Sequence, residues 1–317
     1  MTALPEEPDD VAALATIVLG GRAESITRVP SFAGNRVFRL DAGTGAVYLK
    51  LGAHRDIARE HHALALAAGC RVPVPAVVWT DLEQRSSAHA GVALAEVAGE
   101  PLELDAPADR TTELAALMAR WHAIPLAGFG LADPVGGALR GEDASWHESL
   151  LRRAALAHDA ARAGLVAGDL IARVVRSVEG HVALTQLADG RLLYGDFHPR
   201  HVYADSSHIT GIIDWGDATV GDPDYDLARI VHVSFFLGDF DDAARRLAPF
   251  LGGRDAIPPE RAAKLLLYAA VFVCWCMSGE LEGGAPAPRW WPAQERVLGR
   301  LLDAFDRAVS LDAGPLS

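Results

Sequence analysis

The chain has 317 residues, half of them apolar and about a fifth charged, which suits a globular protein with room for two domains or lobes. Its net charge of −13 argues against a nucleic-acid partner, because phosphate binding needs a basic surface. Three cysteines, no apolar run near ~18–20 residues and an acidic start without a signal-peptide pattern lead us to expect a cytoplasmic protein without a disulfide framework or a membrane partner.

The first third of the chain is rich in predicted strands. Residues 36–51 read as two short strands joined by a turn, and a helical pattern follows over residues 56–69. Further strands are predicted within residues 72–81 and 91–99. Residues 96–110 then break the pattern with glycine, proline and acid, so we expect a linker there.

The remainder is predicted to be mainly helical. Apolar residues from Leu114 to Trp121 follow the spacing of a buried helix face, and residues 144–186 and those after about Tyr225 are also helical in pattern. One strand–loop–strand region, residues 192–215, interrupts these helices. The order of elements therefore predicts an α+β protein with a β-rich first part and a helical second part.

Three polar residues in that interruption suggest a chemical site. Asp196 ends one predicted strand, Asp214 ends the next, and His201 leads out of the loop between them. If the two strands pair as a hairpin, the three side chains meet at one end of it. A carboxylate there can orient a hydroxyl, and a second carboxylate beside a neutral imidazole can hold a divalent cation. This combination is what phosphoryl transfer needs.

A nucleotide site also needs a cation, and Lys50 is the candidate. The chain contains 27 arginines and only two lysines, so a lysine in mid-strand indicates that a compact point charge is needed. Glu60, ten residues later on the predicted helix, is placed to pair with it. The sequence Gly43-Thr44-Gly45 mimics part of a phosphate loop but reads better as a hairpin turn, and no P-loop motif is present.

At this point the residues resemble those of the aminoglycoside phosphotransferase family, which are small-molecule kinases with a protein-kinase-like fold. YGDFHPRH is similar to the catalytic loop of that family, IIDWGD to its metal-binding segment, and GDPDYDLARI to the segment that follows. The likeness covers about residues 30 to 230. It implies a bilobal protein-kinase-like fold, with a nucleotide-binding lobe over residues 1–97 and a catalytic and acceptor-binding lobe over residues 98–317.

The resemblance also implies roles for these residues. Asp196 would be the catalytic base that orients the acceptor hydroxyl, and Asp214 would bind Mg²⁺ with His201. Lys50, held by Glu60, would contact the α- and β-phosphates of ATP or GTP.

Further positions follow from the same likeness. The segment that contains Ser31, Gly34 and Asn35 would lie over the phosphates, and backbone groups near Glu96 and Val97 would hold the nucleotide base. Asp226 would anchor the catalytic loop rather than do chemistry.

Two residues depart from the common pattern of the family. Tyr194 replaces the usual histidine of His-Gly-Asp, where we expect a packing role, and His201 replaces the usual metal-binding asparagine. Because Mg²⁺ prefers oxygen ligands, His201 raises the alternative of a nucleotide-binding pseudokinase. The loop nevertheless resembles that of macrolide phosphotransferases, which carry histidine at this position and are active enzymes.

The acceptor is the least defined part of the prediction. Asp217, Asp222 and Asp224 follow Asp214 without any basic residue among them. Two interpretations are open: some of them face an amine-bearing acceptor, or they form an exposed acidic loop. His198 either approaches the reacting groups or shapes the loop. Acid favours an aminoglycoside, whereas the aromatic residues of the last helices and His201 favour a macrolide.

The sequence thus predicts an ATP- or GTP-dependent kinase that phosphorylates a hydroxyl of a small, cationic molecule, with an aminoglycoside antibiotic as first choice. The alternatives are a macrolide kinase, a metabolic kinase for a sugar or amino alcohol, the pseudokinase and a metallophosphohydrolase. The last would need further His and Asp clusters, and His61-His62 is the only other close pair. The oligomeric state is left open.

Overall fold

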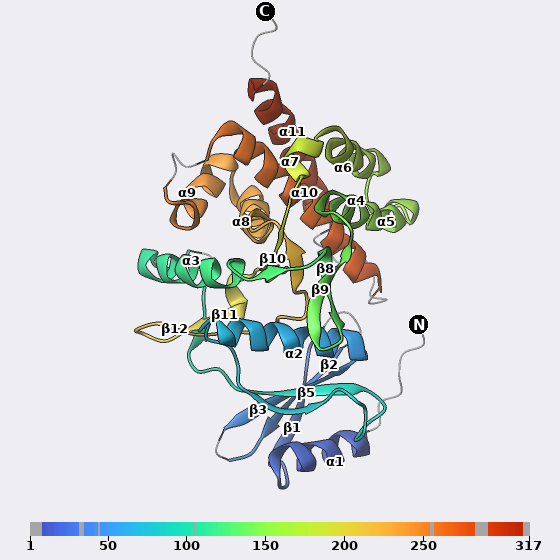
Figure 1. Cartoon of the computed structure of the whole chain (residues 1–317), viewed down its shortest axis with the longest axis vertical. Coiled ribbons are helices and arrows are strands. Elements are labelled where there is room, and N and C mark those ends of the chain that lie inside the picture. Colours follow the sequence, from blue (N-terminus) through green and yellow to red (C-terminus); the bar gives the residue numbers. More distant parts are fainter. Residues whose placement is uncertain are drawn as a thin grey trace, which may run out of the picture.

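The computed structural model describes residues 8–31, 35–43, 45–103, 105–253, 257–282 and 291–312. A β-rich part and a larger helical part are stacked along the long axis of the molecule (Figure 1). The chain therefore has the bilobal α+β architecture that the sequence predicts, while the exact division at residues 97 and 98 stays a prediction.

The small lobe is built on one antiparallel sheet in the order β1-β2-β3-β5-β4. The pairing of Arg36 with Leu51 sets the register of the central β2–β3 hairpin, whose turn contains Gly43 and Gly45. The elements of this lobe are α1 (Pro8–Leu19), β1 (Ser25–Val29), β2 (Arg36–Asp41), β3 (Ala46–Gly52), α2 (His54–Gly69), β4 (Val77–Asp81) and β5 (Ala90–Ala95).

The alternation of side chains along β3 decides what each face of this sheet contacts. Leu49 and Leu51 are buried in the cluster that α1 completes, whereas Val92 of β5 belongs to the core that α2 shares. Lys50 points to the α2 face, as the period of two requires. In Figure 1 α1 and α2 accordingly lie on opposite sides of the sheet.

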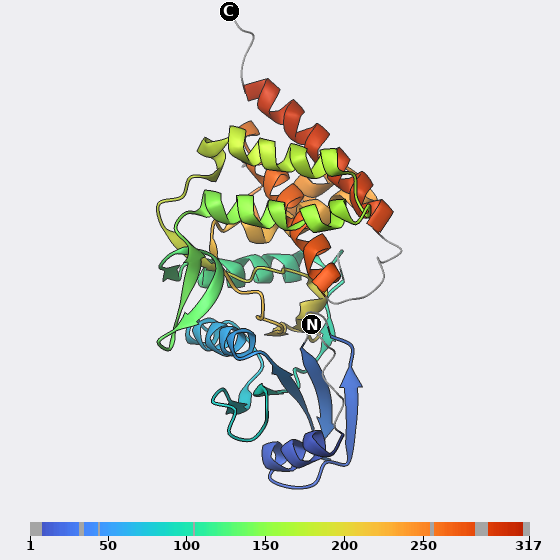
Figure 2. The same ribbon diagram turned by 90° about the vertical axis from the view of Figure 1, so that its right-hand side faces the viewer.

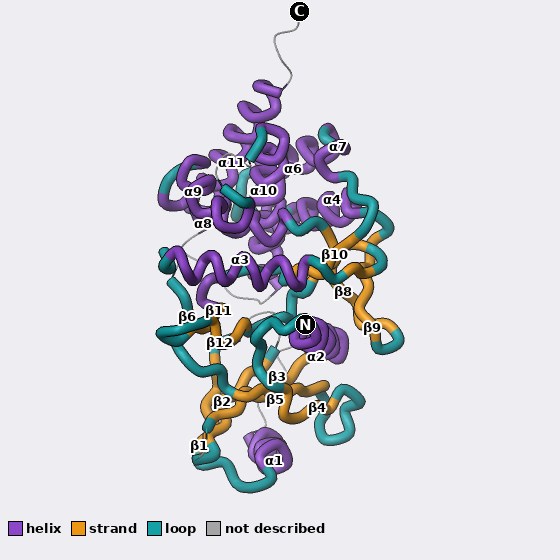
Figure 3. The backbone as a smooth tube through the Cα atoms, turned by 60° about the vertical axis from the view of Figure 1, so that its left-hand side comes forward, coloured by secondary structure: helices purple, strands orange, loops and turns teal. Residues whose placement is uncertain are grey.

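The segment after β5 joins the small lobe to the catalytic region. Its short strand β6 (Glu100–Pro101) pairs with β11 (Val202–Ala204), which in turn pairs with β12 (Ile209–Ile212). Helix α3 (Ala108–His122) follows and crosses between the two parts of the molecule (Figure 3). The linker is therefore paired with β11, the strand that directly follows the predicted catalytic loop.

The large lobe packs its helices in layers around α10, as the side view shows (Figure 2). Residues 265–274 of α10 are all buried, which is why this helix is apolar on every side. The helices are α4 (Trp146–Leu156), α5 (His158–Arg162), α6 (Gly168–Gly180), α7 (Val182–Thr185), α8 (Asp224–Leu237), α9 (Phe240–Leu251), α10 (Pro259–Glu282) and α11 (Trp291–Asp312).

The apolar character of α10 has a packing explanation. Among the helices in the described ranges, this is the one with a stretch, Pro259–Ser278, long and apolar enough to cross a membrane by length and composition. The interior of the protein buries 78% of that window. This is the pattern of a core helix.

Two features of the large lobe differ from the prediction. The expected pairing of the strands before Asp196 and Asp214 is wrong: β10 (Gly190–Leu193) pairs with β13 (Thr219–Gly221) and β7 (Pro125–Leu126), whereas β12 pairs with β11. The sequence pattern also missed a hairpin of β8 (Phe129–Val135) and β9 (Ala138–Asp143), whose strands each contain a glycine and lack a clear alternation. Figure 3 shows this hairpin reaching toward α2.

Candidate active site

The loop that follows β10 is fixed by one buried carboxylate. Asp226 on α8 is 1% exposed and accepts hydrogen bonds from the backbone N–H groups of Tyr194 and Gly195, each at 2.9 Å. It also accepts from Trp121 Nε1 at 3.1 Å and lies 2.8 Å from His122 Nε2. A carboxylate with this many donors cannot turn toward a substrate, so Asp226 has the anchoring position expected from the family resemblance.

A close backbone contact brings the two predicted catalytic segments together without a shared hairpin. Gly195 has φ +90°, and a Cβ atom there would lie 1.9 Å from the carbonyl oxygen of Asp217. Only glycine permits this approach. The contact sets Asp196 beside the segment that contains Asp214 and Asp217, and burial beside Asp196 and Asp214 raises the pKa of Asp217 to about 7.

Lys50 joins the small lobe to this cluster of carboxylates. Its Nζ atom lies 2.6 Å from Glu60 Oε2 and 2.8 Å from Asp214 Oδ1. Burial acts to lower the pKa of Lys50, but Glu60 and Asp214 outweigh it and raise that pKa, so the ammonium stays charged. The pairing of Lys50 with Glu60 that the sequence suggested is present. The contact of Lys50 with Asp214 links the small lobe to the large lobe.

Asp214 is the most exposed side chain of the three that meet at Lys50. It takes the left-handed backbone conformation, with φ +62°, and its side chain is 49% exposed, whereas Glu60 is only 2% exposed. The charge of Lys50 lowers the pKa of Asp214 and outweighs the opposing effect of burial. A non-glycine residue at positive φ is typical of a functional turn, because the surrounding structure must hold it there.

His201 reaches the same group through hydrogen bonds that the sequence analysis missed. Its Nδ1 atom lies 2.9 Å from the hydroxyl of Tyr194, and that hydroxyl donates to the carbonyl oxygen of Ile213 at 2.6 Å. Tyr194 is buried, as the expected packing role requires, but its hydroxyl also connects His201 to the residue before Asp214.

The side chains around Asp214 show how many protein ligands a metal ion would find there. Within the described ranges, no three His, Cys, Asp or Glu groups lie close enough to hold a metal ion by themselves. Asp214 and His201 nevertheless provide two ligand groups beside further carboxylates. This number of ligands fits a divalent cation that completes its coordination with nucleotide phosphates.

The segment expected over the phosphates is described only at its ends. Gly34 lies outside the described residues. Ser31 donates from its hydroxyl to the carbonyl oxygen of Asn35 at 2.5 Å, which closes the base of this segment. Asn35 Oδ1 is buried against Gly52 without a hydrogen-bond partner, so this side chain turns toward the sheet. Contact of these residues with a nucleotide remains a prediction.

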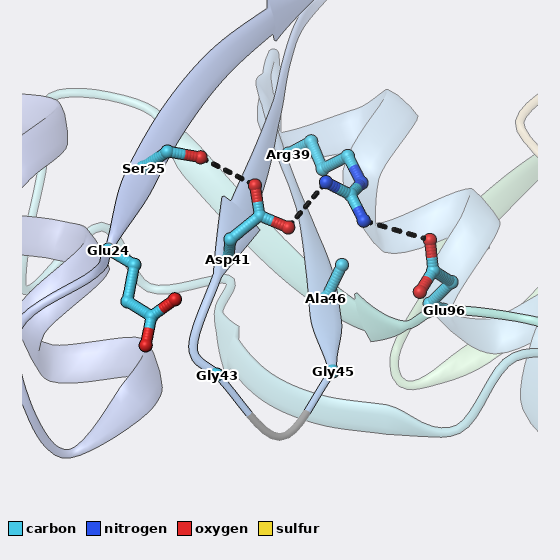
Figure 4. Close-up of a pocket in the computed structure, with 8 residues that line it drawn as sticks. All are labelled: Glu24, Ser25, Arg39, Asp41, Gly43, Gly45, Ala46 and Glu96. Atoms are coloured by element: carbon cyan, nitrogen blue, oxygen red, sulfur yellow. Dashed lines mark hydrogen bonds and ion pairs between the residues drawn. The ribbon is translucent and has the colours of Figure 1, made fainter.

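Glu96 lines a pocket of about 410 Å³ on the small lobe, together with Arg39 and Asp41 (Figure 4). Arg39 connects its carboxylate, at 3.3 Å, to that of Asp41. The backbone N–H of Glu96 donates to the carbonyl oxygen of Ala46 at 3.0 Å. Val97 packs its side chain over Gly211. The expectation that backbone groups here hold the base is compatible with this geometry.

The acidic surface expected for a cationic acceptor is not formed by Asp222 and Asp224. Both carboxylates are buried at the start of α8, where Lys264 lies 2.9 Å from Asp222 and 2.6 Å from Asp224. Arg261 adds a further contact of 2.7 Å to Asp224. The assignment of these two residues to the acceptor is therefore corrected: they bind the basic residues of α10, which lie too far along the sequence for a local pattern to reveal.

His198 has a structural contact that limits its role. Its Nδ1 atom accepts the N–H of Arg200 at 3.1 Å and so caps the short 3₁₀ helix η1 (Pro199–His201). Burial, together with Arg229 and His201, lowers the pKa of His198 to about 4, so its imidazole is neutral. The structure brings it to the edge of the site, 5.5 Å from His201 between ring centroids.

Arg59 is a site residue that the sequence analysis did not identify. It is 3% exposed, and it donates to the carbonyl oxygens of Ala132 at 2.5 Å and Gly216 at 3.0 Å. It thereby ties α2, which carries Glu60, to β8 and to the segment after Asp214. Only the buried environment marks it, because an arginine beside a glutamate on a helix ordinarily indicates a solvated face.

Comparison with known proteins decides the family. A model of the phosphotransferase enzyme family, APH, matches residues 25–271. The chain belongs to this family. It is therefore a small-molecule phosphotransferase of kinase-like fold, in agreement with the sequence prediction.

Solved structures of low sequence identity share this fold of the APH family. Aminoglycoside phosphotransferase APH(4)-Ia, in a ternary complex with AMP-PNP and hygromycin B, has a TM-score of 0.68 at 18% identity, over 94% of this chain and 99% of that one. A putative fructosamine-3-kinase from Haemophilus somnus 129PT gives 0.63 at 16%, over 92% and 96%. A GDP complex of an aminoglycoside 2'-phosphotransferase-IIIa mutant gives 0.62 at 19%, over 98% and 100%.

Proposed function

We propose that this APH-family enzyme transfers the γ-phosphate of ATP or GTP to a hydroxyl group of a small molecule. The observation that carries the proposal is the contact of Lys50 with both Glu60 and Asp214, beside the loop of Asp196. It sets a cation, an open carboxylate and a candidate base at the junction of the two lobes, which is the arrangement that phosphoryl transfer uses. The AMP-PNP and GDP complexes of the structural neighbours support a nucleotide donor.

Each residue has one task in this proposal. Asp196 accepts the hydrogen bond of the acceptor hydroxyl and aims its oxygen at the γ-phosphate. Lys50, kept charged and in place by Glu60, binds the α- and β-phosphates. Asp214 and His201 are the residues that would hold Mg²⁺, which offsets phosphate charge when bound. Asp226 keeps the loop of Asp196 fixed while these groups act.

For the acceptor, we propose an aminoglycoside as the first class to test. The hygromycin B complexes of APH(4)-Ia support it, and the carboxyl groups of Asp196, Asp214 and Asp217 lie close together at the reacting centre. Since Asp222 and Asp224 are engaged by Lys264 and Arg261, fewer carboxylates than expected face an amine. A sugar-amine acceptor is the second candidate, because a putative fructosamine-3-kinase has the same fold. The macrolide alternative rests on the likeness of the catalytic loop and on the aromatic residues of the last helices.

The experiment is nucleotide-dependent phosphorylation of a panel of aminoglycosides, fructosamines, macrolides and amino alcohols, measured by the mass shift of the acceptor. The variant Asp196→Asn should lose at least ~100-fold in turnover while nucleotide affinity stays within about twofold, because the base acts on the hydroxyl and not on the nucleotide. The exposed Asp189→Asn, the same exchange outside the site, is the matched control. Turnover that survives in Asp196→Asn would remove Asp196 from this role, and nucleotide binding without any turnover would support the pseudokinase.

A further inference from the structure

The two residues that depart from the common catalytic loop contact each other. Tyr194 stands where the family usually has histidine, and His201 where it usually has asparagine. The hydroxyl of Tyr194 lies 2.9 Å from Nδ1 of His201. Because both departures meet in one hydrogen bond, they form a single structural unit rather than two independent substitutions.

The direction of this hydrogen bond follows from the third partner. The Tyr194 hydroxyl has one proton, and the carbonyl oxygen of Ile213, at 2.6 Å, can only accept it. The hydroxyl oxygen must therefore accept from Nδ1–H of His201, and in a neutral imidazole this is the single ring proton. The other ring nitrogen, Nε2, then carries the free lone pair.

The backbone holds His201 next to the open carboxylate. The N–H of Ile213 donates to the carbonyl oxygen of His201 at 2.9 Å, in continuation of the β11–β12 ladder. Asp214 follows Ile213 directly in the chain. The backbone thus holds His201, with the free lone pair on Nε2, next to the residue that precedes the exposed carboxylate of Asp214.

We infer that Tyr194 is a positioning residue: its hydroxyl holds neutral His201 in the Nδ1–H form and leaves Nε2 as the metal ligand beside Asp214. The inference rests on the proposed function for the presence of a nucleotide-bound cation. A histidine that ligates a metal through one nitrogen is ordinarily fixed by a hydrogen bond at the other, and Tyr194 supplies that bond here.

A nitrogen ligand in place of an amide oxygen changes which cation is favoured. Mg²⁺ strongly prefers oxygen, whereas first-row transition metals accept imidazole. The unit formed by Tyr194 and His201 therefore favours Mn²⁺ relative to Mg²⁺ in the presence of nucleotide. The variant His201→Asn should shift that ratio toward Mg²⁺.

The first test needs neither metal nor nucleotide. Two-bond ¹H–¹⁵N spectra of protein labelled at histidine, recorded at about pH 8 where an ordinary imidazole is neutral, distinguish the two forms of the ring. The signal that His201→Asn removes should show the Nδ1–H pattern in the parent protein and lose it in Tyr194→Phe. An Nε2–H pattern for His201 in the parent would overturn the inference, whatever the enzyme phosphorylates.

The second test measures Mn²⁺ and Mg²⁺ affinity by calorimetry in the presence of AMP-PNP, without acceptor. Tyr194→Phe should weaken Mn²⁺ binding by about 10-fold or more, the usual cost of losing the partner of a metal-binding histidine. In a His201→Asn background the same exchange should change affinity by no more than about twofold.

This comparison separates positioning from a merely structural effect. Tyr194→Phe removes the hydrogen bond to Ile213 in the parent protein and in the His201→Asn variant alike. An equal drop in Mn²⁺ affinity in both proteins would therefore contradict the role of Tyr194 toward His201. Phosphorylation of an acceptor is not measured in either test. Failure of the proposed acceptor chemistry therefore stays distinguishable from failure of this inference.

Discussion

At the scale of single residues, the site depends on the buried ion pair of Lys50 and Glu60 and on the exposed carboxylate of Asp214, which also contacts Lys50. Lys50 is held between Glu60, which is buried, and Asp214, which is half exposed. A buried pair contributes little net stability, but the loss of one partner leaves an uncompensated charge in a low-dielectric environment. Glu60 thus positions the lysine, and the exposed carboxylate stays available to a cation.

Replacement of Lys50 tests this arrangement. We expect Lys50→Met to destabilise the fold by about 3 kcal/mol, because Glu60 remains buried without its partner. The double variant Lys50→Met, Glu60→Leu should recover most of that loss while remaining inactive. Urea denaturation measures both, and a double variant no more stable than the single one would show that the pair does not act as a unit.

At the scale of elements, the large lobe depends on polar contacts between its helices. His232 on α8 lies 2.6 Å, through Nε2, from Oε1 of Gln294 on α11. Nη1 of Arg229 lies 3.3 Å from Nδ1 of the same imidazole, and the rings of Phe236 and Phe272 pack against the His232 ring. Burial and the charge of Arg229 lower the pKa of His232 from 6.5 to about 3. The α8–α11 contact therefore requires a neutral imidazole.

This contact predicts a pH dependence of stability. The unfolded chain protonates His232 below pH 6.5 and the folded protein only near pH 3, so its contribution is complete above 6.5 and is lost as the pH falls toward 3. We expect a loss of about 1 kcal/mol of unfolding free energy per pH unit from this residue over that window. His232→Gln should flatten the slope in denaturation series between pH 7 and about 5, and an unchanged slope would exclude His232 as its source.

At the scale of the whole molecule, α2 belongs to both lobes. It packs on the small-lobe sheet, while Arg59 donates to the carbonyl oxygens of Ala132 and Gly216 in the large lobe. Arg55, nearer the surface, pairs with Asp133 at 2.7 Å and Glu142 at 3.0 Å of the β8–β9 hairpin. The position of Glu60, and through it of Lys50, is therefore set jointly by the two lobes.

Two substitutions on this helix should differ in effect. Arg59→Met leaves two carbonyl groups without their buried donor, so we expect a loss of about 2–4 kcal/mol in stability and weaker nucleotide binding. The matched exchange Arg55→Met removes only exposed ion pairs and should cost no more than about 1 kcal/mol. Equal effects of the two variants would contradict the central role given to Arg59.

Local patterns predicted much of this, because they report local physics. The β2–β3 hairpin, the helix that bears Glu60 and the pairing of that residue with Lys50 follow from side-chain periodicity and turn chemistry. The β8–β9 hairpin was missed because its strands lack a clear alternation of polar and apolar residues. The partners of Asp222 and Asp224 were missed because they lie about forty residues further along the chain. The hydrogen bond from Tyr194 to His201 was missed because the conformation of the loop between them, and not the identity of either residue, brings the two side chains together.

The hydrogen bond between Tyr194 and His201 also has an evolutionary consequence. An ancestor that exchanged only one of the two positions would carry either a tyrosine hydroxyl without its imidazole or an imidazole without its orienting partner. Selection should therefore have favoured their joint replacement. In an alignment of related sequences, tyrosine at the first position should co-occur with histidine at the second far more often than their separate frequencies imply, and independent variation would show that lineages have treated them as separate choices.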